Sequence, residues 1–216
     1  MALLVPAILA KTAKEFNEKL EMVAPYCHKI QVDIMDGIFV KEKTISVNEI
    51  PKFTYPLKIE LHLMIKDPLS IFQYEKHPAV SAVIFHYEST DKPAEILQAM
   101  PKRIIKGVAL NPETPTKVLQ PIISQIDMVL LMSVKPGKDG QQFMPNTLVK
   151  ISEVKNMRPG IIVEVDGGIN SENAADIANL GVDQAVVGST LYGSNNLKRT
   201  IKNIMLELGD IEGVAV

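Results

Sequence analysis

The chain has 216 residues, of which 46% are hydrophobic, and its 23 basic and 25 acidic side chains give a formal net charge of −2. This near balance, without a basic cluster, argues against a protein that binds nucleic acid through its charge. The single cysteine, Cys27, excludes a disulfide framework and a cysteine-rich zinc module.

The amino-terminal segment is apolar but short. Pro6 interrupts it and no basic region precedes it, so it does not resemble a signal peptide. No stretch approaches the roughly 20 apolar residues that cross a bilayer. We therefore expect a cytoplasmic protein without a membrane partner.

Eight short apolar runs recur along the chain, each about as long as a β-strand and most of them rich in β-branched residues. We predict strands over residues 3–9, 30–35, 59–65, 82–87, 106–110, 128–134, 161–165 and 184–188. Because these runs are apolar nearly throughout, they indicate strands covered on both faces, as in a parallel sheet.

Segments with helical spacing lie between the strands. A capping box at Thr12 begins the first helix. Further helices are expected after the cap and prolines of residues 111–115, from Asn170 to a stop at Gly181, and over residues 197–208.

Alternating strands and helices suit a compact α/β fold. At about 27 residues per unit, the chain accommodates eight βα units in a single domain, residues 1–216, folded as a closed (β/α)8 TIM barrel. A doubly wound open sheet is the alternative. The main irregularity is the segment 37–56, which has little helical pattern.

Polar side chains interrupt the apolar runs where several predicted strands end. They are Gln31, Asp33, Glu60, His62, His86, Glu88, Glu164 and Asp166. In a barrel these strand ends meet at one rim, where chemistry takes place. A carboxylate buried there costs several kcal/mol unless it is paired, hydrogen-bonded or bound to a metal, so the group indicates a functional site.

Glycine-rich loops follow the last three predicted strands, at residues 137–141, 167–168 and 188–189. Glycine lets backbone N–H groups approach an anion, and barrels often bind phosphate in these loops. The three loops together predict a phosphate site after strands six, seven and eight. The sequence contains no P-loop and no dinucleotide fingerprint.

With these residues the sequence resembles the ribulose-phosphate 3-epimerase family from Pro6 to about Tyr192. The shared motifs are PAIL at 6–9, VDIMDGIFV at 32–40, LHLM at 61–64, KGVALNPETP at 106–115, VLLMSV at 129–134, VDGGIN at 165–170 and VGS at 187–189. The resemblance implies an isomerase of the pentose phosphate pathway that interconverts D-ribulose 5-phosphate and D-xylulose 5-phosphate.

The resemblance also implies the roles of the rim residues. Asp33 and Asp166 would act as the acid/base pair that moves the C3 proton through an enediolate. Asp33, His62 and Asp166 would also bind a divalent cation (zinc, iron, manganese or cobalt), which neutralises the developing oxygen charge. The implied substrate-binding residues are His62, His86, Met35, Met64, Met132, Gly140, Gln141, Gly167, Gly168, Gly188 and Ser189. Core packing explains the methionines equally well.

Departures from the family pattern fall mainly inside this predicted site. Gln31 stands where the family has its second histidine ligand, and an amide carbonyl is a weaker ligand than imidazole for zinc or iron. Ala7 replaces a serine and Lys41-Glu42 a Pro-Asn pair. The phosphate loop, Phe-Gly-Gly-Gln in the family, reads KDGQ at residues 138–141, so that Asp139 adds an anion.

Three functions therefore stay open at this point. The first is a pentulose-phosphate 3-epimerase with an altered metal site. The second is an epimerase or isomerase of another sugar phosphate, and the third is a sugar-phosphate-binding homologue without catalysis. In each case the partner is a small sugar phosphate. The family often forms homo-oligomers, but the sequence identifies no interface.

Overall fold

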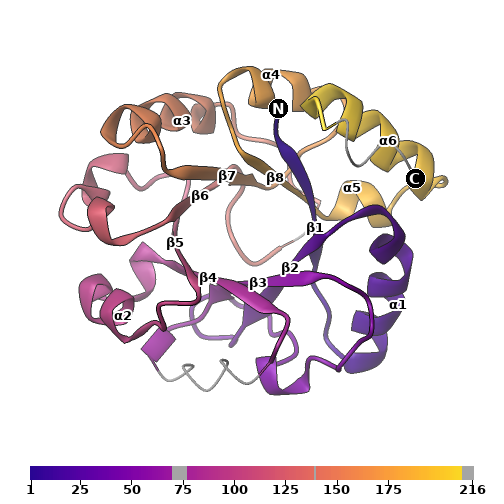
Figure 1. The fold of residues 1–216 in the computed structure, drawn as a ribbon, viewed down its shortest axis with the longest axis horizontal. Coiled ribbons are helices and arrows are strands. Elements are labelled where there is room, and N and C mark those ends of the chain that lie inside the picture. The colour runs from indigo at the N-terminus through magenta and orange to yellow at the C-terminus, as the bar shows by residue number, and fades with distance from the viewer. Residues whose placement is uncertain (70–76, 139, 211–216) are drawn as a thin grey trace.

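Eight parallel strands close into a barrel in chain order in the computed structural model, which describes residues 1–69, 77–138 and 140–210 (Figure 1). The strands are β1 (Leu3–Ile8), β2 (Lys29–Met35), β3 (Lys58–Met64), β4 (Val80–His86), β5 (Ile105–Leu110), β6 (Met128–Met132), β7 (Ile162–Asp166) and β8 (Gln184–Val187). Each predicted strand is present, and β1 pairs with β8 to complete the ring. The closed barrel confirms the (β/α)8 fold and rules out the open sheet.

Helices surround the barrel on its outside (Figure 1). The α-helices are α1 (Ala13–Val23), α2 (Pro93–Ala99), α3 (Asn146–Met157), α4 (Ala174–Asn179), α5 (Ser189–Tyr192) and α6 (Leu197–Leu208). Short 3-10 helices are η1 (Ala24–Tyr26), η2 (Val47–Glu49), η4 (Tyr87–Ser89), η5 (Thr116–Leu119) and η6 (Ile123–Gln125). Among the described residues, none of the helices has the length and apolar character of a membrane span.

Local sequence signals account for most of these helices. The Thr12 side chain caps α1 by accepting a hydrogen bond from the Glu15 N–H, and α6 has the predicted bounds. The helix predicted after residues 111–115 is wrong, because two 3-10 turns take its place. Pro121 explains the difference, since proline lacks an N–H and its ring clashes with the carbonyl four residues earlier.

The start of α4 also differs from the prediction. The helix begins at Ala174 with Asn173 as its cap residue, and Asn170 instead forms a tight turn, accepting from the N–H of Glu172. The irregular segment 37–56 contains no helix besides the short η2, as its lack of helical pattern predicts, and Lys43 forms an isolated antiparallel bridge with Asp36. These differences lie outside the barrel wall and leave the strands in place.

Two apolar layers hold the barrel together. The larger lies between strands and helices and includes Phe16 and Leu20 of α1 and Ile201 and Ile204 of α6. The smaller fills the barrel interior with alternate strand residues, among them Val5, Ala7, Ile84, Ala109, Leu130 and Val186. Because strand side chains alternate in direction, the same alternation turns Gln31, Asp33 and His62 inward. The interior therefore contains both apolar and polar side chains, the polar ones on β2, β3 and β7.

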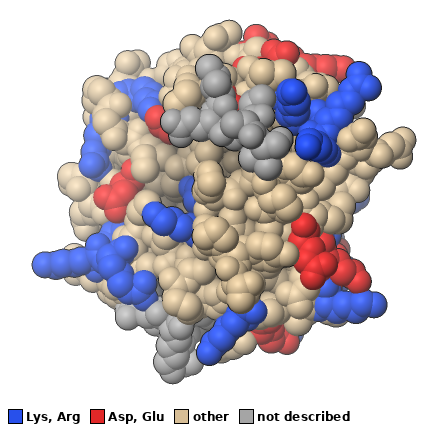
Figure 2. All heavy atoms as spheres, turned by 45° about the vertical axis from the view of Figure 1, so that its right-hand side comes forward, with Lys and Arg blue, Asp and Glu red and all other residues tan. Residues whose placement is uncertain are grey.

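The outer surface carries both kinds of charge. On the face shown in Figure 2, basic and acidic side chains both lie around the edge, and uncharged side chains occupy much of the middle.

Candidate active site

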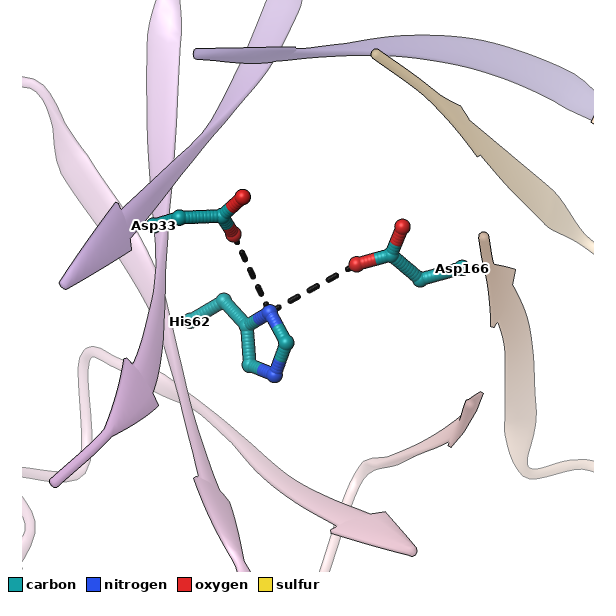
Figure 3. A group of neighbouring side chains, drawn as sticks. All are labelled: Asp33, His62 and Asp166. Atoms are coloured by element: carbon teal, nitrogen blue, oxygen red, sulfur yellow. Dashed lines mark hydrogen bonds and ion pairs between the residues drawn. The ribbon is translucent and has the colours of Figure 1, made fainter. Parts of the chain in front are cut away.

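Three side chains from three strands converge at the mouth of the barrel. Asp33 belongs to β2, His62 to β3 and Asp166 to β7. Parallel pairing places Asp33 directly beside His62, and barrel closure brings Asp166 toward them from the far wall (Figure 3). One ligand atom from each lies within 4.8 Å of the other two. The structure thus assembles the three residues that the sequence singled out.

His62 Nδ1 points between the two carboxylates. It lies 3.1 Å from Asp33 Oδ1 and 3.5 Å from Asp166 Oδ2 (Figure 3). His62 is fully buried and Asp33 nearly so, whereas Asp166 is partly exposed. Two carboxylate oxygens and a ring nitrogen facing one point are the usual surroundings of a bound cation or a shared proton.

Gln31 completes this cluster. Its Nε2 donates hydrogen bonds to Asp33 Oδ1 at 3.0 Å and to Asp166 Oδ2 at 2.8 Å, and it lies 3.4 Å from His62 Nδ1. The Gln31 Oε1 is buried without a hydrogen-bond partner among the described residues. His28 is exposed just before β2. The amide therefore occupies the position that the missing imidazole would have taken.

Behind His62 lies His86, the last residue of β4. The two Nε2 atoms are 2.9 Å apart, and the ring centroids are 5.0 Å apart with the ring planes inclined by 25°, so the rings meet edge to edge. Burial lowers the pKa of His62, against opposing effects of Asp166 and Glu60, and burial lowers the pKa of His86 to about 4. Both rings are therefore neutral at pH 7.

Most predicted substrate-binding residues share one pocket. Its lining includes Asp33, Asp166, Ala7, Met35, Met64, Met132, Lys138, Gly140, Gln141, Gly167, Gly168, Gly188 and Ser189. His62 and His86 do not line this pocket, because they are fully buried beneath it. The carboxylates and the glycine loops thus belong to a single cavity.

Two of these glycines are required by their surroundings. Gly167 has a φ of 117°, and an added Cβ would lie 2.4 Å from Val134. Gly168 has a φ of 64°, and its Cβ would lie 2.5 Å from the backbone nitrogen of Phe143. A side chain at either position would therefore displace a loop at the mouth.

The other departures lie around the same mouth. Glu42 forms an ion pair with Lys11 at 3.0 Å. Lys41 and Lys138 line a neighbouring pocket together with Phe39. Asp139 lies outside the described residues, so the anion that it was expected to add has no described position.

Sequence reasoning grouped Glu60 and Glu164 with the rim residues, but they belong to a second polar layer below the first, together with Lys29 and Gln184, which it did not single out. Lys29 Nζ forms an ion pair with Glu60 Oε2 at 2.5 Å and also hydrogen-bonds the Gln184 side chain. Glu164 is fully buried, and burial together with the neighbouring Glu60 raises its pKa well above the usual value. Lys29 is the sequence feature that could have revealed this layer, because it is a charged residue at the start of a buried strand, on the face that points into the barrel.

A closed parallel barrel with carboxylates, an imidazole and glycine loops at one mouth defines the class of (β/α)8-barrel enzymes. Within that class, the sequence model of the Ribulose-phosphate 3 epimerase family matches residues 3–192. The chain belongs to this family, which confirms the resemblance seen in the motifs.

Individual relatives agree with the family. The chain is 33% identical over 213 residues to the ribulose-phosphate 3-epimerase of Bacillus subtilis (strain 168), covering 94% of this chain and 98% of that one. It is 37% identical over 187 residues to the same enzyme of Buchnera aphidicola subsp. Baizongia pistaciae (strain Bp), covering 81% of each. The crystal structure of 3-hexulose-6-phosphate synthase from Salmonella typhimurium has the same fold, with a TM-score of 0.70 at 18% identity over 96% of this chain and 99% of that one.

Proposed function

We propose that this chain is a ribulose-phosphate 3-epimerase that interconverts D-ribulose 5-phosphate and D-xylulose 5-phosphate. The observation that carries the proposal is the pair of carboxylates in one pocket, where Asp33 on β2 and Asp166 on β7 lie within 3.0 Å of a common Gln31 nitrogen. Epimerisation removes a proton from one face of a carbon and returns a proton to the other. It therefore requires two acid/base groups on opposite sides of the substrate.

In this mechanism one aspartate, ionised, removes the C3 proton of the ketose phosphate. The electron pair moves toward the carbonyl oxygen and gives an enediolate. The other aspartate, protonated, then delivers its proton to the opposite face of C3, and the reverse reaction exchanges the two roles. Met35, Met64 and Met132 line the pocket and would exclude water from the reacting carbon.

The glycine loops would bind the phosphate end of the substrate. Gly140, Gly168 and Gly188 line the same pocket as the two carboxylates. Exposed backbone N–H groups suit a phosphate dianion, and Lys138 adds a positive charge to the lining. A sugar phosphate held at both ends would have its central carbons between the aspartates.

The residues at the mouth also fit a divalent cation. Asp33, His62 and Asp166 offer two oxygens and one nitrogen, and the unpartnered Gln31 Oε1 supplies a further oxygen if the amide turns over. Such a cation would stabilise the charge on the enediolate oxygens. Three oxygens and one nitrogen make a harder ligand set than one with two imidazoles, which favours manganese over zinc.

The test is epimerisation by the purified protein supplied with Mn²⁺, comparing the wild type with Asp33→Asn and Asp166→Asn. Each substitution should lower kcat by roughly 10² to 10⁴-fold, because general acid–base catalysis is lost. Asp176→Asn, an exposed aspartate on α4, is the matched control and should retain full activity. Wild-type activity no greater than that of Asp166→Asn would contradict the proposal.

A second candidate is an epimerase of another sugar phosphate. Lys41 and Lys138 beside the mouth favour it, because they give the pocket charges where the family pattern has none. A panel of ketose and aldose phosphates separates the candidates, and a wide preference for the pentulose pair would reject the second. Ligand-induced stabilisation without turnover under any metal would instead indicate a homologue that only binds.

A further inference from the structure

We propose that Glu88, acting through His86, fixes the ring proton of His62 on Nε2 and leaves the Nδ1 lone pair facing Asp33 and Asp166. Glu88 is then a positioning residue that contacts neither substrate nor cation. The inference deepens the proposed function and rests on it in one respect, since His62 Nδ1 is the atom that a cation at the mouth would bind.

The first link joins the two histidines. Their Nε2 atoms lie 2.9 Å apart and both rings are fully buried. A contact this short between two ring nitrogens requires an N–H on one and a lone pair on the other. The protonation of either ring therefore determines that of its neighbour.

The second link joins His86 to Glu88 in η4, just beyond the end of β4. His86 Nδ1 faces Glu88 Oε2 across 3.4 Å. Both atoms are buried without a shorter, well-aligned hydrogen bond among the residues that the structure describes, and the Asn111 side chain also interacts with His86. The other oxygen, Oε1, accepts from the Asn111 N–H at 2.8 Å and from the Thr114 hydroxyl. Both donors hold the carboxylate in a fixed orientation.

Glu88 remains ionised in this setting. Burial raises its pKa, but hydrogen bonds from His86, Thr114 and Asn111 outweigh that effect and leave the pKa below its usual value. An ionised carboxylate only accepts hydrogen bonds, so the proton of His86 belongs on Nδ1. His86 Nε2 is then the acceptor, and His62 Nε2 is the donor.

The orientation of these protons has a consequence at the mouth. With its proton on Nε2, His62 presents a lone pair at 3.1 Å from Asp33 Oδ1 and 3.5 Å from Asp166 Oδ2, and the Gln31 amide at 3.4 Å compensates it only in part. The opposite tautomer would donate directly to Asp33 and would leave no ring-nitrogen lone pair for a cation to bind. Glu88 thus keeps His62 Nδ1 available to a cation at the mouth.

Glu88→Gln tests this relay because it preserves the shape and reverses the hydrogen bonding. The two donors at Oε1 require an acceptor, so they should hold the carbonyl of the new amide there and turn its NH₂ toward His86. His86 must then accept at Nδ1 and donate at Nε2. His62 must accept at Nε2 and carry its proton on Nδ1.

Long-range ¹⁵N–¹H correlation spectra of the metal-free protein read these tautomers directly. With four histidines in the chain, the His62 and His86 signals are assigned by their absence from His62→Asn and His86→Asn. In the wild type we expect Nε2–H on His62 and Nδ1–H on His86. In Glu88→Gln each ring should carry its proton on the other nitrogen, so that His62 has Nδ1–H and His86 has Nε2–H. His77, whose Nδ1 accepts from the Ala79 N–H, is an internal reference that should not change.

Mn²⁺ titration supplies a second readout. Glu88→Gln should weaken binding by about 10 to 100-fold, the usual cost of losing the group that orients a histidine ligand. Thr114→Val, which removes one donor but keeps the carboxylate, should leave the tautomers unchanged. Glu113→Gln controls for the loss of one negative charge, because Glu113 is exposed and its ion pair with Lys135, at 3.6 Å, is exposed as well.

Two outcomes would overturn the proposal. One is a wild-type His62 that carries its proton on Nδ1, and the other is a folded Glu88→Gln protein with unchanged tautomers. The wild-type spectrum alone decides the first, so the test survives a variant that fails to fold. Because the spectra need neither substrate nor metal, failure of the relay is distinguishable from failure of the epimerase assignment.

Discussion

The barrel interior contains two buried polar layers. On β2, β3 and β7, residues of the lower layer come two residues before residues of the upper layer, and β8 adds Gln184 to the lower layer. The lower layer, defined by Lys29, Glu60, Glu164 and Gln184, balances its charges internally through an ion pair and a protonated carboxyl group. The upper layer, defined by Gln31, Asp33, His62 and Asp166, directs two carboxylates at a neutral imidazole and an amide. A polar cluster whose charges cancel suits a structural role, whereas one that requires a proton or cation provides a reaction site.

The largest effect should follow from breaking the ion pair of the lower layer. Lys29→Met leaves Glu60 buried without its cation, so the free energy of unfolding should fall by about 3–5 kcal/mol. Denaturant unfolding of the variant measures the loss. Lys58→Met is the matched control, because Lys58 lies next to Lys29 in the register but is exposed. An equal loss in both variants would show that the ion pair stabilises nothing.

A pH effect should follow from the raised pKa of Glu164. The folded protein keeps a proton that the unfolded chain releases near pH 4.5. The associated stability is complete below that pH and is lost as the pH rises toward the folded pKa, by up to about 1.4 kcal/mol per pH unit. Glu164→Gln retains an N–H donor toward Glu60 but cannot ionise. We compare the free energies of unfolding of the variant and the wild type by denaturant unfolding from pH 5 to 8. The difference should shift steadily in favour of the variant as the pH rises. A difference that does not change with pH would contradict a raised pKa of Glu164.

Restoring an imidazole to the upper layer should change its metal preference. Gln31→His exchanges an amide oxygen for a ring nitrogen, so zinc affinity should rise by roughly 10-fold or more while manganese affinity changes less. Competition with a chelator measures both. Gln31→Leu, which removes both polar atoms, should bind neither metal more tightly. Equal zinc affinity in Gln31→His and the wild type would place residue 31 outside the coordination sphere.

The smallest effect should come from removing a charge in the upper layer. Asp166→Asn relieves repulsion between two neighbouring carboxylates, so the metal-free protein should become more stable by about 0.5–1 kcal/mol while losing activity. Thermal unfolding without metal measures the gain, with Asp176→Asn as the exposed control. A loss of several kcal/mol would mean that the upper layer is as structural as the lower one.

The wall of the barrel could be predicted because each strand is buried on both faces. Its apolar run is then visible without its neighbours, and observed and predicted strand ends agree within two residues. The connections were less predictable. Residues 111–125 carry a cap and apolar spacing, yet Pro121 breaks the helix into η5 and η6.

The candidate site, like the fold, could be predicted only in part. Asp33, His62 and Asp166 could be identified from motifs, because an acidic or imidazole side chain at the end of an apolar strand is costly to bury unless it is paired or binds a ligand. The lower layer was not separated from the site, since Glu60 and Glu164 interrupt their strands in the same way as the rim residues and Lys29 is an ordinary charge along the sequence. The sequence places Glu88 among the polar residues of the rim but does not predict its link to His62, because that link runs through His86 and across strands.

By itself, the sequence determined the eight-stranded barrel, its family and the substitution of Gln31 for an imidazole. These follow from patterns along one chain: the spacing of apolar runs, the order of motifs and a residue type at a given position. The tertiary structure decided what Gln31 donates to, which carboxyl group keeps its proton and which tautomer of His62 faces the mouth. Hydrogen bonds and pKa values depend on atoms that only closure of the barrel brings within a few ångströms of one another.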